Sequence, residues 1–278
     1  RALARQAEIE AAVLLKNDHN LLPLSKSIAT IAVIGPSADT PQTGDYSPRP
    51  AEGQLVSVLA GIRSHVSAST KVLFAAGLDK PNSVDTSHFA EAAAIAKQAN
   101  VAVIVVGDLS HFHGGKPTTG EGFDSATLEL PGAQHQLIEA IEATGTPVVL
   151  VLVNGKPFTL QWEATHIPAI LETWFPGEEG GNATADLLFG DANPSGRLPV
   201  TWPRSVGQLP LNYDYLPTGR SFDYADLPAT PQWPFGYGLS YTQFRYSNLR
   251  ITSVPGDPAS VTVTADIENR GLRDGDEV

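Results

Sequence analysis

The sequence predicts an α/β fold with a mainly parallel, flavodoxin-like sheet covered by helices on both faces. Short β-branched apolar runs alternate with amphipathic helical segments over the first 190 residues, as in chains built from strand-helix-strand units. The run at 101–107 ends in a glycine and is apolar almost throughout, which is typical of a parallel strand buried on both faces.

The elements follow in order. We expect a first amphipathic helix over residues 4–15, ended by a polar turn at 17–20. The predicted strands are the apolar runs at 31–34, 72–75, 101–107, 148–153 and 168–173. The predicted helices are the periodic segments at 56–66, 89–99, 133–143 and 182–188.

The pattern changes after residue 191. Proline and glycine are too frequent up to about residue 243 for regular elements, and we expect the aromatic residues of this tract to pin it onto the body. Beyond Phe244, apolar Val261, Val263 and Ile267 alternate with polar residues. This period of two predicts an antiparallel strand with one solvated face, the start of a β-sandwich.

Composition argues against several classes of partner and site. A formal net charge of -12 argues against a nucleic-acid or anionic-membrane partner, because both require clustered Lys and Arg. No apolar run approaches the ~18 residues of a membrane span. The absence of cysteine excludes disulfides and thiolate metal sites. The sequence opens inside a helical pattern and ends in a strand region, so we expect a piece of a longer polypeptide.

The loop after the strand at 101–107 is where we expect chemistry, because open α/β sheets bind ligands outside the carboxyl ends of their strands. This loop carries six ionisable residues: Asp108, His111, His113, Lys116, Glu121 and Asp124. The glycines that flank Glu121 permit positive φ angles and close approach of a substrate. An acid lowered into a cleft from such a loop becomes a proton donor; a solvated loop carboxylate is the alternative.

A metal site is a second hypothesis for the same loop. His111 and His113, with Asp108, form a His-x-His plus carboxylate pattern that suits zinc or iron. The spacing has low specificity, and hydrogen bonding to a polar ligand or simple solvation explains these residues equally well. We therefore expect no metal and no other cofactor.

A family resemblance is carried by a set of motifs in fixed order: IAVIGPSAD, GDYS, GEGFDSATLELPGAQ, VLVNGKPF, FPGEEGGNATADLLFGDANPSGRLPVTWP and FGYGLSYTQF. With these motifs the chain resembles the C-terminal α/β sandwich domain of family 3 glycoside hydrolases, almost end to end. Residues after Tyr246 resemble the opening of a fibronectin type III-like domain. The resemblance implies an α/β domain over 1–235, then a linker and the first strands of the next domain over 236–278.

The resemblance also implies an active site shared between domains. The family's Asp nucleophile lies on a preceding (β/α)₈ barrel, and the acid/base of many members is the Glu of an E-G-x-D-R segment. That segment reads Glu121-Gly122-Phe123-Asp124-Ser125 here, so the role falls to Glu121. Ser125 replaces the usual Arg and removes a partner of Asp124. Sugar or leaving-group contacts would come from Tyr46, His111, Phe112, His113, Lys116 and Phe123.

The function implied is that of a retaining, exo-acting β-glucosidase or β-xylosidase acting on small saccharides or aryl and alkyl glycosides. We expect the fragment alone to be inactive and its compartment to be periplasmic or secreted rather than cytoplasmic. Two alternatives remain open from the residues: a carbohydrate-binding or scaffolding module without catalysis, and a metal-dependent hydrolase using Asp108, His111 and His113.

Overall fold

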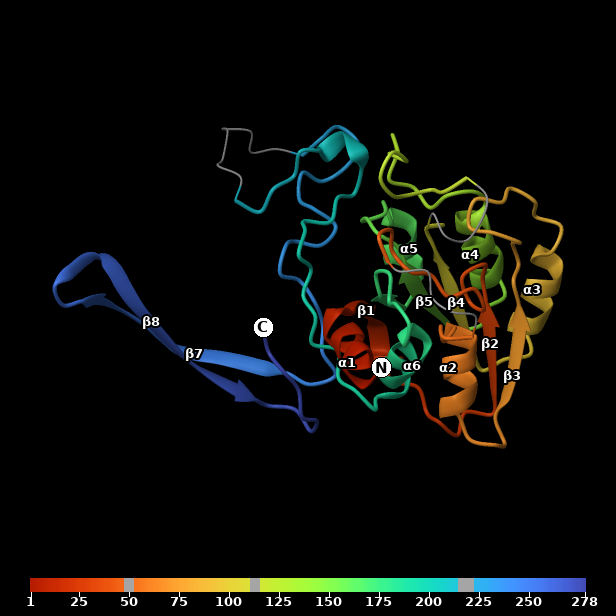
Figure 1. The fold of residues 1–278 in the computed structure, drawn as a ribbon, viewed down its shortest axis with the longest axis horizontal. Helices are drawn as coiled ribbons and strands as arrows, with labels where there is room; N and C mark the ends of the chain where they lie inside the picture. The colour runs from red at the N-terminus through yellow and green to blue at the C-terminus, as the bar shows by residue number, and fades with distance from the viewer. Residues whose placement is uncertain (48–52, 111–115, 215–222) are drawn as a thin grey trace.

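The computed structural model describes residues 1–47, 53–110, 116–214 and 223–278. A six-stranded sheet lies at its centre with helices against both faces, and a two-stranded hairpin projects from this body (Figure 1). The strands of the sheet are β1 (Val13–Asn17), β2 (Thr30–Ile34), β3 (Lys71–Ala75), β4 (Val101–Gly107), β5 (Val148–Val153) and β6 (Ala169–Glu172). The helices are α1 (Ala2–Ala11), α2 (Val58–His65), α3 (Phe89–Ala96), α4 (Gln134–Glu142), α5 (Gln161–His166) and α6 (Gly180–Phe189).

The strand order of the sheet is β1-β6-β5-β4-β2-β3. All neighbours pair in parallel except β1, which runs antiparallel to β6 at the edge. Counted from β2, the parallel strands therefore follow the doubly wound 2-1-3-4-5 order of flavodoxin-like folds. The predicted α/β class is confirmed.

Successive residues of the central strands point to opposite faces and enter two separate cores. On one face, Ala102, Ile104 and Val106 of β4 pack with α3 and α4. On the other face, Val103 and Val105 pack with α2 and α6. Both faces are covered, which explains why β4 and β5 carry apolar residues at nearly every position.

The prediction of one helix over residues 4–15 is wrong. The helix α1 ends at Ala11, and Val13, Leu14 and Leu15 lie in the edge strand β1, fully buried. Leu14 pairs with Leu171 of β6 on one side. On its other side, the carbonyl oxygen of Leu14 accepts a hydrogen bond from the N–H of Leu239 at 2.8 Å. The short helix α5 was also not predicted, since it spans only six residues.

The proline-rich tract is fastened by its tryptophans. The backbones of Trp202 and Trp233 form an isolated bridge, and both side chains are buried in the core shared with α3 and α4. The indole Nε1 of Trp202 donates a hydrogen bond to the carbonyl oxygen of Phe158 at 2.5 Å, so the buried ring leaves no unpaired donor. The anchoring role expected for these two aromatic residues is confirmed.

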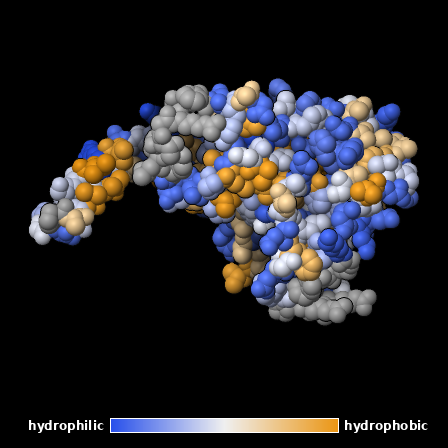
Figure 2. All heavy atoms as spheres, turned by 90° about the horizontal axis from the view of Figure 1, so that it is seen from above, coloured by the Kyte–Doolittle hydropathy of each residue, from blue (hydrophilic) through white to orange (hydrophobic). Residues whose placement is uncertain are grey.

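The hairpin consists of β7 (Phe244–Val254) and β8 (Asp257–Asn269), paired antiparallel as predicted. The expected burial of one face is not seen in this structure: Leu249, Ile251, Val261 and Val263 are all exposed. Figure 2 shows the apolar side chains gathered on this arm. The tail after β8 returns to the body, where Glu277 forms an ion pair with Arg197 at 2.6 Å. Among the described residues, no helix is long and apolar enough to cross a membrane.

Candidate active site

The candidate site lies where the connections from β2 and β4 leave the sheet. These neighbouring parallel strands occupy the point at which the strand order reverses, and ligands of open α/β sheets bind at the carboxyl ends there. The loop after β2 carries Tyr46, and the loop after β4 carries Glu121. The topology thus brings together two segments far apart in the sequence.

Tyr46 and Glu121 are in direct contact. The phenolic hydroxyl of Tyr46 donates a hydrogen bond to Oε2 of Glu121, and this bond raises the pKa of Tyr46. Both side chains are exposed, and Tyr46 has a left-handed backbone with φ of 65°. A bulky residue adopts this conformation only when its surroundings require it.

A glycine permits the approach of the two loops. Gly120 has φ of +119°, and a side chain at this position would overlap the carboxylate of Asp45. The backbone of the Glu121 loop therefore lies against the side chain of Asp45 in the loop that bears Tyr46, and the φ of Gly120 is one that residues with a side chain rarely adopt. The expectation that glycines shape this loop thus has a specific structural basis at Gly120.

The other predicted contact residues are distributed differently. Phe123 is half-buried, and its backbone N–H donates to the carbonyl oxygen of Gly120 at 3.0 Å in a turn. Lys116 is exposed, and its carbonyl oxygen accepts from Asn82 at 2.9 Å. His111, Phe112 and His113 lie outside the described residues.

Beneath the loop lies an ion pair that the sequence analysis did not identify. Asp108 is completely buried at the end of β4, and its Oδ1 lies 2.5 Å from Nζ of Lys156, which follows β5. Thr118 donates its hydroxyl to the same carboxylate oxygen at 2.7 Å. The signal was available in principle, because Gly107 and Val153 are register partners on adjacent strands and both charges follow them closely.

This arrangement bears on the metal hypothesis. The carboxylate of Asp108 accepts from Lys156 and Thr118 through Oδ1, and from the backbone N–H of Gly155 through Oδ2 at 3.4 Å. A metal would have to displace an ammonium group from a buried carboxylate. The contacts of Asp108 fit a structural ion pair better than a ligand set.

A second buried acid, also missed, lies at the end of β6. Glu172 is completely buried; its carboxyl oxygens accept from the backbone N–H of Trp174 at 2.6 Å and from Nδ2 of Asn154 at 3.1 Å. Burial raises the pKa of Glu172 well above its ordinary value, and the nearby charge of Asp108 adds to this effect. Glu172 therefore retains its proton more readily than an exposed glutamate does, and it belongs to the floor of the site.

Phe175 supports the same region from below. A side chain at Gly44 or at Gly155 would contact the ring of Phe175, at 3.4 Å and 2.9 Å respectively. The ring thus packs between the loop that bears Tyr46 and the turn that precedes Lys156. Residues that follow β2, β5 and β6 thus lie in contact with one another, and Gly155 also joins them to Asp108 after β4.

Two cavities lie beside this edge. One of about 280 Å³ adjoins the base of the Glu121 loop and is lined by Asp108, Thr118, Ser125, Thr127, Glu129, Leu130, Pro131, Gly132 and Lys156. A larger one of about 410 Å³ lies toward α4 and α5, with His135, Trp162, Glu163 and Arg204 in its wall. Neither is lined by Glu121 or Tyr46.

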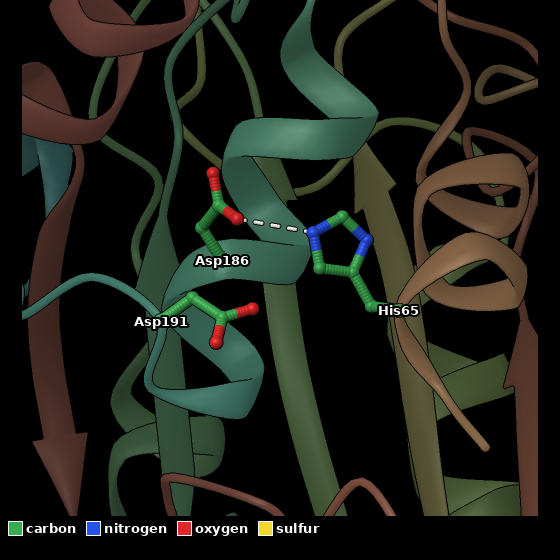
Figure 3. Close-up of side chains that lie close together, drawn as sticks. All are labelled: His65, Asp186 and Asp191. Atoms are coloured by element: carbon green, nitrogen blue, oxygen red, sulfur yellow. Dashed lines mark hydrogen bonds and ion pairs between the residues drawn. The ribbon is translucent and has the colours of Figure 1, made fainter.

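A different cluster of ligand-type side chains lies at the far ends of α2 and α6. His65, Asp186 and Asp191 approach one another there, with His65 Nε2 3.0 Å from Asp186 Oδ1 (Figure 3). Arg5 forms two hydrogen bonds with the carboxylate of Asp186, at 2.5 and 2.6 Å, and Lys26 pairs with Asp191 at 2.5 Å. The cluster is therefore an ion-pair network that joins α1, α2 and α6.

Comparison with known proteins gives a consistent result. The model of the glycosyl hydrolase family 3 C-terminal domain matches residues 12–241. A periplasmic beta-glucosidase of Salmonella typhimurium is 41% identical over 99% of this chain and 39% of its own length. A beta-xylosidase of Formosa agariphila is 41% identical over 100% of this chain and 39% of its own length.

A solved structure agrees in fold. The crystal structure of a beta-glucosidase from Listeria innocua in complex with isofagomine matches with a TM-score of 0.85 and 35% identity. The match covers 97% of this chain and 38% of that one. The chain thus spans about two fifths of the length of the relatives it matches.

The fold and the edge described above define an α/β sandwich domain that presents a carboxylic acid at the switch point of a doubly wound sheet. The match over residues 12–241 identifies the family: the chain belongs to glycosyl hydrolase family 3, as its C-terminal domain. The family predicted from the sequence motifs is confirmed.

Proposed function

We propose that this chain supplies the general acid/base, Glu121, to a retaining, exo-acting β-glucosidase or β-xylosidase. The Asp nucleophile would lie on an N-terminal (β/α)₈ barrel of the same, longer polypeptide. The observation that supports this most directly is the position of Glu121. It is exposed on a glycine-shaped loop at the carboxyl edge of the sheet, with one oxygen bonded to Tyr46.

The chemistry proposed needs two carboxyl groups about 5–5.5 Å apart. In the first step, protonated Glu121 donates its proton to the glycosidic oxygen while the Asp of the barrel bonds to the anomeric carbon and the leaving group departs. In the second step, Glu121 as carboxylate takes a proton from water, whose oxygen attacks the anomeric carbon and releases the Asp.

Tyr46 defines which oxygen of Glu121 acts. Its hydroxyl bonds Oε2, so we assign the transferred proton to Oε1. The exposure of Glu121 in this chain also fits the proposal, because the barrel would cover the acid and exclude water from it.

The surrounding residues would contact the substrate, a small saccharide or an aryl or alkyl glycoside. Phe123 and Lys116 flank Glu121 in the same loop, and His111, Phe112 and His113 are assigned to the same role from the sequence. We also propose that residues 1–235 form the sandwich domain and residues 236–278 begin a fibronectin type III-like unit. A periplasmic or secreted location is proposed, as for the periplasmic relative from Salmonella.

The test uses the full-length enzyme and a Glu121→Ala variant. General acid catalysis is typically worth about 10²–10⁴-fold, so we expect kcat/KM to fall by that order for alkyl glycosides. Activated aryl glycosides should suffer much less in the glycosylation step, since their leaving groups barely need a proton. Azide, which attacks without base catalysis, should restore turnover and yield a glycosyl azide.

A matched control variant and the 278-residue chain without the barrel complete the experiment. Glu129→Ala, at an exposed carboxyl in the same connection, should change neither substrate's rate. The 278-residue chain alone should show no turnover, and addition of the barrel should restore it. Equal losses on both substrates without azide rescue would assign the role to another residue, with Asp124 the next one to test.

A further inference from the structure

The loop that carries Glu121 is closed at its base by one carbonyl group. The carbonyl oxygen of Thr118 accepts a hydrogen bond from Oγ of Ser125 at 3.1 Å and another from Nζ of Lys156 at 3.2 Å. Thr118 and Ser125 are the two ends of a short segment with Glu121 near its middle. The distance between these ends limits where Glu121 can lie.

Thr118 is in turn attached to the end of β4 by several bonds. Its Oγ1 accepts from the N–H of Leu109 at 2.8 Å and donates to Oδ1 of Asp108 at 2.7 Å, while its N–H donates to the carbonyl oxygen of Leu109 at 3.0 Å. Apart from the bond from Ser125, these hydrogen bonds of Thr118 lead either to the strand end or to Lys156. The first residue of the segment is therefore held rigidly against the sheet.

The buried negative charge of Asp108 explains why a lysine stands at position 156. A completely buried carboxylate such as that of Asp108 is stable only with a charged or hydrogen-bonded partner, and Lys156 supplies the cation at 2.5 Å. The same ammonium group donates a second hydrogen bond, to the carbonyl oxygen of Thr118. Because β4 and β5 are adjacent and paired in parallel, the two charges start from a fixed separation.

We propose that Lys156 and Asp108 are positioning residues for the acid/base: their ion pair fixes Thr118, and through Thr118 the loop that aims Glu121 at Tyr46 and the substrate. Neither residue would contact the substrate. This inference rests on the proposed function of Glu121, and its tests are chosen to separate the two.

The first test measures position without catalysis. Lys156→Met removes the cation from the isolated 278-residue chain, and the titration of the Tyr46 hydroxyl, followed by NMR of ¹³Cζ-labelled tyrosine, reports whether Glu121 still lies beside it. We expect Tyr46 to titrate at lower pH in Lys156→Met, as in Glu121→Gln. An unchanged Tyr46 titration in a folded Lys156→Met chain, with a shift in Glu121→Gln, would overturn the positioning role whatever the enzyme does.

The second test measures catalysis in the full-length enzyme. Misplacement of a catalytic group by about 1 Å costs on the order of 10²-fold, so kcat/KM of Lys156→Met on alkyl glycosides should fall by roughly that factor. Activated aryl glycosides should lose far less, and Lys156→Arg should recover part of the loss. Equal losses on both substrates would indicate a general structural role and overturn the proposal.

Two further variants keep the result decisive. Asp108→Asn/Lys156→Met removes both charges together, so it tests the same ion pair if the single variant does not fold. Lys26→Met removes a cation from an exposed pair far from the site and should change neither substrate's rate. If Glu121→Ala itself shows no dependence on the leaving group, the proposed function fails, while the Tyr46 titration still decides the positioning role.

Discussion

Gly61 on α2 and Gly181 on α6 lie backbone against backbone. A methyl group at Gly61 would overlap the carbonyl oxygen of Gly181, and one at Gly181 would overlap the carbonyl oxygen of Ser57. The two helices cross here because both residues lack a side chain. The contact fixes α6, which follows the site-forming turn after β6, against the face of the sheet that α2 covers.

We predict that Gly61→Ala destabilises the chain by about 1–3 kcal/mol or more, since overpacking of a close contact displaces the backbone. The intrinsic helix propensity of Ala favours the variant by about 1 kcal/mol and will not offset the overlap. Urea denaturation measures the difference. Gly207→Ala, where the nearest neighbouring atom to a new methyl lies at 3.6 Å, is the control and should be close to neutral.

The ion-pair network around the residues drawn in Figure 3 leads to a second prediction. The carboxylate of Asp186 is only 7% exposed. Arg5→Met removes the guanidinium group that donates two hydrogen bonds to it. Breaking a buried pair costs about 3–5 kcal/mol, and because Arg5 itself is partly exposed we expect about 2–3 kcal/mol. Lys26→Met breaks an exposed pair with Asp191 and should cost about 0–1 kcal/mol. Equal losses of unfolding free energy in the two variants would contradict this account.

The buried acid Glu172 predicts a pH dependence of stability. Its pKa is raised in the folded chain, so between the ordinary value and the raised one the folded state binds a proton that the unfolded state has lost. Stability from this group is therefore complete at acidic pH and declines as pH rises, by up to about 1.4 kcal/mol per pH unit.

Glu172→Gln should flatten that slope, because the amide does not titrate. The variant should also lose some stability at every pH, since Gln offers one acceptor oxygen where Glu172 accepts from both Trp174 and Asn154. Unfolding free energies measured from pH 5 to 9 separate the two effects. Parallel pH curves for the wild type and the variant would show that Glu172 does not titrate as proposed, and Glu129→Gln serves as the exposed control.

The fold was largely predictable because burial on both faces leaves a local signature. Runs such as Val148–Val153 are apolar at every position and end in polar turns, so their strand character does not depend on knowing the partners. The edge strand β1 was not predictable in this way. Val13, Leu14 and Leu15 continue the apolar pattern of α1, and only their pairing with β6 makes them a strand.

The site was predictable only in part, for a related reason. Composition indicated the loop of Glu121, but the bond from Tyr46 joins residues 75 positions apart. The pair of Lys156 and Asp108 joins residues 48 positions apart. Such contacts depend on the strand order of the sheet, and no local spacing encodes it.

The contact between Tyr46 and Glu121 gives the last prediction. The hydrogen bond to Glu121 raises the pKa of Tyr46, with a smaller contribution from the charge of Asp45. Glu121→Gln removes the negative charge that accepts this proton, so the tyrosinate forms more easily and the pKa of Tyr46 should fall toward its ordinary value. The titration of ¹³Cζ-labelled tyrosine measures it, with Tyr46→Phe to assign the signal.

Tyr246, whose pKa is raised in the same way by Glu277, provides an internal control whose titration should not change. A shift of both tyrosines would indicate a global effect, and a shift of neither would mean that Glu121 is not the partner of Tyr46 in solution.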